Sequence, residues 1–408
     1  MPRLGEFITL TKGNSYKGEY LDQEGEYLLG LGTIKQGGGF KLNNLKEYSG
    51  PYKEEQLVHP GETYLALTSL TEITRPFLGS PATIPFEFPR RGIITHHVGK
   101  VDWKTEDQLW RDYCRWTFHS LQFRFYCMYK CIGTTVFSIS PRDVLDYPIE
   151  AHISEQKKSV VHVLNSFEKL KSSKIKENHS LQSQIQELYF QTFLRTKHGQ
   201  SIVKTDDSNL PEGWVEASLH DIAVQRKDTL RIDDIDAETP YVGLTHIPKR
   251  NLCMSSWGDA SELASNKYQI SQGDILFGKL RPYFHKVAIA PTEGVCSTDI
   301  LVVNAIEDYD YALVLAILFS SRFVEYVSAI VTGVSLPRTS WKDFRFFKFA
   351  LPPISMRKKF SKQIQPLLER IVLNRGQLNS IDGMMNDCIQ MLAENETDSF
   401  HDSAEWSE

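Results

Sequence analysis

A cluster of basic and aromatic side chains at residues 278–286 is the stretch of this sequence best suited to bind a charged partner. It reads GKLRPYFHK and directly follows the apolar residues 275–277. Arginine and lysine donate hydrogen bonds to phosphate oxygens and to the edges of guanine. If the preceding strand continued, alternate side chains would share one face. The pattern predicts that nucleic acid is contacted by Lys279, Arg281, Tyr283 and Lys286. A solvated loop is the equal alternative.

A second segment with similar chemistry lies at residues 332–339, which read TGVSLPRT. Glycine and hydroxyl residues beside a single arginine suit contacts with phosphate, so Thr332 and Arg338 are further candidates. The first half of the chain has no comparable basic cluster. By position alone, its candidates for the same role are Lys35, Gln36, Thr68 and Arg75.

Catalytic and metal-binding signatures are missing from the sequence. It has no phosphate-binding GxxxxGK[ST] loop, no HExxH, no GxSxG and no paired CxxC motif. His96 and His97 are adjacent, and neighbouring residues of a strand point to opposite faces, so we expect structural or surface roles for them. The sequence therefore predicts a protein that binds rather than reacts, with no catalytic residue, no metal site and no cofactor of its own.

Composition restricts the class of protein further. The 408 residues are 41% hydrophobic and 24% charged, which is ordinary for a globular protein long enough for two or three domains. The net charge of −5 means that any nucleic-acid contact depends on local basic patches. No run of 18 apolar residues and no signal peptide is evident, and the six cysteines form no disulfide framework. We expect a cytoplasmic protein with no membrane contact.

The main structural element that supports these candidates is a long helix, which the sequence contains twice. Residues 153–195 and 354–392 carry apolar residues in alternating steps of three and four, the pattern of a coiled coil. The two apolar seams coincide at an offset of 200, so that Val160 matches Phe360. Both seams place a polar residue at the same position, Lys174 and Asn374. Such a residue usually sets the register of a coiled coil at some cost in stability.

Each long helix is preceded by a block of about 150 residues, and landmarks of the two blocks correspond. Residues 61–65 match 273–277, Gly133 matches Gly333, and residues 140–143 match 340–343. We expect residues 108–129 to be helical and residues 140–143 to cap a final strand. The chain thus reads as a tandem duplication of mixed α/β blocks and helices, with boundaries at 1–148, 149–200, 201–350 and 351–395, and with a disordered acidic tail at 396–408.

These motifs resemble, in order along nearly the whole chain, the specificity (S) subunits of type I restriction-modification systems. Residues 210–214 (LPEGW) resemble the entry into a target recognition domain of that family. Residues 273–282 resemble its central motif, and residues 351–354 (LPPI) resemble the run into its conserved helix. Residues 153–157 (ISEQK) resemble the start of the first such helix. The first block lacks the entry motif, and Met356–Arg357 stands where the family favours Glu–Gln.

The resemblance implies a non-catalytic subunit that reads double-stranded DNA. Each block would be a target recognition domain for one half of a split site, and the two helices would pack antiparallel and set the spacer. Two modification (M) subunits and then restriction (R) subunits would dock, bringing S-adenosylmethionine, ATP and Mg²⁺ with them. By the same resemblance, docking would involve the helix starts, at Glu155, Gln156, Lys157, Arg357 and Lys358.

Other functions remain compatible with the sequence. One is a DNA-recognition subunit of a related two-gene modification and restriction system. Another is a coiled-coil scaffold whose blocks bind protein partners. A stand-alone nuclease or methyltransferase is disfavoured because the catalytic motifs are missing.

Overall fold

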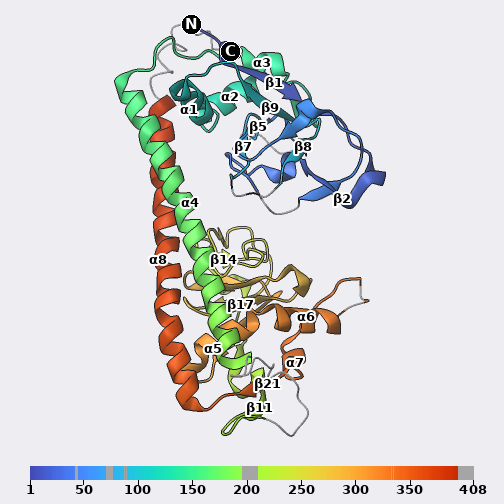
Figure 1. Cartoon of the computed structure of the whole chain (residues 1–408), viewed down its shortest axis with the longest axis vertical. Helices are drawn as coiled ribbons and strands as arrows, with labels where there is room; N and C mark the ends of the chain where they lie inside the picture. Colours follow the sequence, from blue (N-terminus) through green and yellow to red (C-terminus); the bar gives the residue numbers. More distant parts are fainter. Residues whose placement is uncertain are drawn as a thin grey trace. The chain divides into compact units, whose positions relative to one another are not determined.

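A computed structural model describes residues 1–41, 45–69, 77–86, 88, 90–194, 210–331, 333 and 335–393. The chain divides into two compact units (Figure 1). Unit 1 comprises residues 1–169 and 382–408, and unit 2 comprises residues 170–381. Each unit contains one block and one end of the long helix pair.

Unit 1 contains two four-stranded sheets. The first is antiparallel, in the order β1-β9-β5-β7, and comprises β1 (Ile8–Lys12), β9 (Val98–Trp103), β5 (Thr63–Ala66) and β7 (Pro81–Thr83). The second, in the order β3-β2-β8-β4, has a parallel β2–β8 pair and comprises β3 (Lys46–Tyr48), β2 (Leu21–Leu29), β8 (Gly92–Ile94) and β4 (Leu57–Val58). The remaining elements are β6 (Thr68–Ser69), β10 (Phe137–Ser138), α1 (Gln108–Thr117), α2 (Leu121–Tyr129) and α3 (Pro141–Leu145).

Unit 2 repeats this topology. Its first sheet, in the order β12-β20-β17-β18, comprises β12 (Ala223–Arg226), β20 (Ile300–Ala305), β17 (Ile275–Gly278) and β18 (Val287–Ile289). Its second, in the order β13-β16-β19-β14-β15, again has one parallel pair and comprises β13 (Thr229–Leu230), β16 (Lys267–Ile270), β19 (Gly294–Cys296), β14 (Pro240–Val242) and β15 (Gly258–Asp259). The other elements are β11 (Val215–Ser218), β21 (Lys348–Leu351), α5 (Tyr311–Leu318), α6 (Ser321–Ile330) and α7 (Trp341–Phe344).

The tandem duplication predicted from the sequence is confirmed. Read in reverse, the second sheet of unit 2 has the strand order of its counterpart in unit 1, plus one extra edge strand, β13. The Tyr126 hydroxyl donates to the carbonyl of Asp143 at 3.0 Å, and the Tyr326 hydroxyl donates to that of Asp343 at 3.3 Å, at an offset of 200. Gly61 and its match Gly273 have φ of 89° and 93°, which only glycine adopts readily.

The long helices are α4 (Glu155–Tyr189), continued by a π-helical turn at Phe190–Leu194, and α8 (Ile354–Ala393). In unit 1, the apolar face of α4 around Leu164 shares a core with Ile389 and Leu392 of α8. In unit 2, Ile185 of α4 shares a core with Ile364 of α8. Along unit 2, Asn178 of α4 contacts Asn374, whereas Phe193, which follows α4, contacts Phe360 near the start of α8, so the two helices pack antiparallel there, as expected.

The two polar seam residues meet in unit 2. Asn374 is completely buried, accepts a hydrogen bond from the Lys174 ammonium at 3.2 Å and donates to the Asn178 side chain at 2.9 Å. Beside this layer the Arg370 guanidinium donates to Glu177 at 2.6 Å. These five residues form a polar layer within an otherwise apolar seam.

Two local expectations were wrong. Residues 108–129 form two helices, because Ser120 interrupts the run and its hydroxyl accepts from the backbone N–H of Phe123, which caps α2. Ser140 caps the short helix α3 and does not precede a strand. Pro141 occupies the first helical position, where the missing N–H of proline costs no hydrogen bond.

Candidate nucleic-acid interface

The basic segment of the second block leaves the sheet sooner than the sequence pattern predicts. Strand β17 ends at Gly278, and Arg281 and His285 adopt left-handed conformations with φ of 49° and 52° on either side of a 3₁₀ turn at Pro282–Phe284. Left-handed backbone is uncommon for residues other than glycine and concentrates at functional sites. The expectation that Lys279, Arg281 and Tyr283 share one strand face is therefore wrong.

The two lysines of this segment are tied into the fold. The Lys279 ammonium donates to the carbonyl of Thr298, and the Lys286 ammonium donates to the carbonyl of Leu244. Burial lowers the pKa of both side chains, and Arg338 nearby lowers that of Lys279 further. Because their charges are partly desolvated and already hydrogen-bonded to carbonyls, these lysines are poorly placed to neutralise phosphate.

Arg281 and Tyr283, by contrast, are exposed, and tertiary pairing brings Arg338 beside them. Leu280 forms a β-bridge with Arg338, and the N–H of Arg281 donates to the carbonyl of Pro337 at 2.8 Å. The half-exposed Arg338 guanidinium pairs with Asp299 at 2.6 Å. Leu280 and Arg338, which are 58 positions apart in the sequence, thus bring the two basic segments together, while Thr332 lies outside the described residues.

The candidates of the first block are more scattered. Lys35 and Gln36 are exposed on a turn that the N–H of Lys35 closes by donating to Gly39, and Arg75 lies outside the described residues. Thr68 is buried in β6, and its hydroxyl is hydrogen-bonded to Nδ1 of His97 at 2.8 Å. The expectation that His96 and His97 point to opposite faces is wrong, because they form a turn between β8 and β9 and their rings lie 3.8 Å apart.

The helix starts, where docking was predicted, contain both buried and exposed side chains. Lys157 is buried in unit 1 and pairs with Glu150 at 2.6 Å, and Arg357 is buried in unit 2 and pairs with Asp310 at 2.6 Å. These two basic residues stabilise their own units. The predicted residues that are exposed are Glu155, Gln156 and Lys358.

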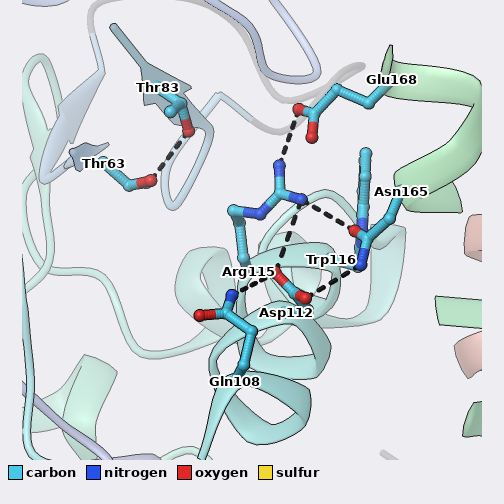
Figure 2. A network of polar contacts seen from close by, with 8 residues as sticks. All are labelled: Thr63, Thr83, Gln108, Asp112, Arg115, Trp116, Asn165 and Glu168. Atoms are coloured by element: carbon cyan, nitrogen blue, oxygen red, sulfur yellow. Dashed lines mark hydrogen bonds and ion pairs between the residues drawn. The ribbon is translucent and has the colours of Figure 1, made fainter. Parts of the chain in front are cut away.

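A polar network that sequence reasoning did not identify attaches α1 to α4 within unit 1 (Figure 2). Arg115 donates to Glu168 at 2.7 Å and to the Asn165 side chain at 3.0 Å, and Asn165 donates to Asp112 at 2.9 Å. Trp116 also donates to Asn165, at 2.9 Å. This network joins the block to the long helix through side chains whose partners lie about 50 residues away, so no local pattern signals it.

Within the described ranges, no group of three or more His, Cys, Asp or Glu side chains is arranged to hold a metal ion. In the same residues no single helix is long and apolar enough to cross a membrane. One bent pair, residues 308–318 with α6, passes that test jointly, and every residue from Ala312 to Leu318 is buried in the core of unit 2.

Comparison with known proteins identifies the class of this fold. Residues 211–382 match the model of the type I restriction modification DNA specificity domain. The fold is similar to the S subunit of a type I restriction-modification system from M. genitalium, with a TM-score of 0.50, 11% identity, and coverage of 96% of this chain and 94% of that one.

Curated relatives agree. The chain is 24% identical to the type I restriction enzyme MjaIX specificity subunit of Methanocaldococcus jannaschii, over 60% of this chain and 60% of the relative. It is also 24% identical to the EcoDI specificity subunit of Escherichia coli, over 32% of this chain and 29% of the relative. The chain thus spans less than two thirds of each curated relative. Its residues 211–382 match the specificity-domain model of type I restriction-modification systems, the family that its motifs resemble.

Proposed function

We propose that this chain is the non-catalytic specificity subunit of a type I restriction-modification complex. Each block reads one half of a bipartite site in double-stranded DNA. The observation that carries the proposal is the repeated frame: two blocks with the same strand order present different side chains at equivalent places. A protein that reads two unlike half-sites needs this combination, because the frame positions the DNA backbone while base-contacting side chains vary.

The recognition domains in this proposal are residues 1–148 and 201–350. In the second, the exposed side chains of Arg281, Tyr283 and Arg338 face DNA. In the first, Lys35 and Gln36 contribute. Because the chain carries a net charge of −5, phosphate contacts depend on these local groups.

The two long helices, α4 and α8, set the spacer between the half-sites and dock two modification subunits, on which restriction subunits then assemble. S-adenosylmethionine, ATP and Mg²⁺ bind those partners, and the complex acts in the cytoplasm. Exposed Glu155, Gln156 and Lys358 are the docking candidates, while Lys157 and Arg357 hold the helix starts in their own units.

Methylation mapping tests the proposal. The chain is expressed with its methyltransferase subunits in a host that lacks other modification genes, and the methylated sites are sequenced. We expect one motif made of two unlike half-sites and an unspecified spacer, and no methylation or cleavage by the purified chain alone. Exchanging residues 1–148 for those of a relative should change one half-site only. Methyl transfer by the isolated chain, or a block exchange that alters both half-sites, would contradict the proposal.

A further inference from the structure

In each block, three segments meet at a junction directly after strand β5 or its counterpart β17. In the second block, the N–H of Lys279 donates to the carbonyl of Asp299 at 2.8 Å, and the N–H of Thr339 donates to the carbonyl of Lys279 at 3.0 Å. In the first, the N–H of Leu67 donates to the carbonyl of His97 at 2.9 Å, and that of Ile139 donates to Leu67 at 2.9 Å. The same pair of backbone hydrogen bonds therefore forms in both blocks.

This pattern of backbone hydrogen bonds shows which residues of the two blocks correspond, where their sequences alone do not. Leu67 corresponds to Lys279, and the turn residue His97 corresponds to Asp299. The next residues along also correspond, because Thr68 pairs with Ser138 in the first block and Leu280 pairs with Arg338 in the second. Ser138 and Arg338 are separated by 200 positions, the offset of the helix seams.

The chemistry at these equivalent positions differs. In the second block the junction carries an ion pair: Asp299 accepts from one nitrogen of Arg338 at 2.6 Å, and the Arg338 side chain is 52% exposed. A guanidinium has five N–H donors, so this contact orients the group and leaves other donors for a ligand. In the first block the position of Asp299 holds His97, whose Nδ1 is hydrogen-bonded to Thr68.

His97 is set up as a neutral polar group. Burial, the neighbouring His96 and the charge of Lys12 all lower the pKa of its imidazole. With Nδ1 engaged by Thr68, Nε2 is the ring nitrogen that can make one further hydrogen bond. One block thus offers a charged group with several donors, and the other offers a single neutral nitrogen.

We propose that this junction reads bases in both blocks. Arg338, oriented by Asp299, contacts a guanine edge in the half-site of the second block, and His97, oriented by Thr68, contacts one base in the half-site of the first. Arginine held by a carboxylate suits guanine, because two guanidinium donors match O6 and N7 in the major groove. The inference rests on the proposed function and names the residues that make the two half-sites unlike.

Three variants of the Asp299–Arg338 pair separate base reading from phosphate binding. In the assembled complex, Arg338→Ala should reduce discrimination at one base pair of the second half-site by about 5- to 150-fold and leave the first half-site unchanged. Arg338→Lys should behave like Arg338→Ala, because a lysine cannot make the paired contact although it keeps the charge. Asp299→Asn, which alters only the orienting group, should give a smaller loss at the same base pair.

A matched control and the opposite outcomes complete the experiment. Arg231 pairs with Asp233 on the exposed surface of the same block, so Arg231→Ala should leave both half-sites intact. His97→Gln should relax one position of the first half-site only. If Arg338→Lys retains wild-type specificity while Arg338→Ala weakens binding to all sequences and reduces its salt dependence, Arg338 holds a phosphate and the inference is wrong. A wild-type complex without a bipartite motif would instead refute the proposed function.

Discussion

At the scale of single residues, His285 shows how the central motif of the second block is held in place. Its Nε2 donates to the carbonyl of Phe319 at 3.0 Å, and its buried Nδ1 has no hydrogen-bond partner among the described residues. Burial and nearby Arg250 lower the pKa of the imidazole. Protonation at Nδ1 would place a charge in this apolar surrounding without a partner to compensate it.

We therefore expect acid to destabilise the chain through His285. Unfolded histidine titrates near pH 6.5, so stability is fully present above that value and is lost as the pH falls towards the lower folded pKa. Each unit of pKa depression corresponds to about 1.4 kcal/mol. His285→Asn, which tolerates the left-handed backbone, should reduce the change in urea unfolding between pH 7.5 and 5.5. An unchanged pH profile would show that His285 does not contribute.

A second residue-scale prediction concerns the start of α8. Arg357 is buried against Asp310, and removing the arginine would leave an uncompensated carboxylate in the core of unit 2. Arg357→Ala should lower the free energy of unfolding by about 3–5 kcal/mol in urea titrations. The neighbouring Lys358→Ala, at an exposed position, should change it by less than about 0.5 kcal/mol. Equal effects of the two variants would mean that the ion pair is not what holds this helix start.

At the scale of elements, the polar layer around Asn374 explains how two long helices keep one alignment. An apolar seam alone would tolerate a shift of a whole turn, whereas the Asn374–Asn178 hydrogen bond forms in one register only. Asn374→Leu leaves the buried amide of Asn178 unpaired, so it should cost about 1–3 kcal/mol. Adding Asn178→Leu should restore stability while allowing other registers.

Disulfide trapping and urea unfolding together test this role of the layer. Cysteine pairs placed one turn out of register across α4 and α8 should form in the double variant and not in the wild type. Asn379→Leu, the same substitution at an exposed position of α8, is the control and should change neither measurement. Trapping of shifted pairs in the wild type would show that the polar layer does not set the register.

At the scale of the whole molecule, the proposed ruler gives a prediction about the DNA site. Four residues inserted in α4 after Leu170, with four in α8 before Leu378, lengthen the helix pair by about 6 Å, nearly one turn. With about 3.4 Å per base pair, the spacer should grow by one or two base pairs while both half-sites stay the same. Methylation mapping provides the measurement. A changed half-site with an unchanged spacer would show that the helices are not the ruler.

The arrangement of two similar blocks and two long helices could be predicted from the sequence. The seams of α4 and α8 and the matched glycines were readable because helical periodicity and positive φ depend on local residue types. From these followed the duplication and the resemblance to type I specificity subunits.

Which side chains are exposed, and which contact one another, became clear only from the tertiary structure. The Lys279 ammonium turns inward to a carbonyl, and Arg338 lies beside Asp299 because strands distant in sequence pair there. The correspondence of His97 with Asp299 emerged only from backbone hydrogen bonds. Long-range pairing is set by the packing of whole sheets, and the residue types at the junction differ between the blocks, so no local pattern could reveal it.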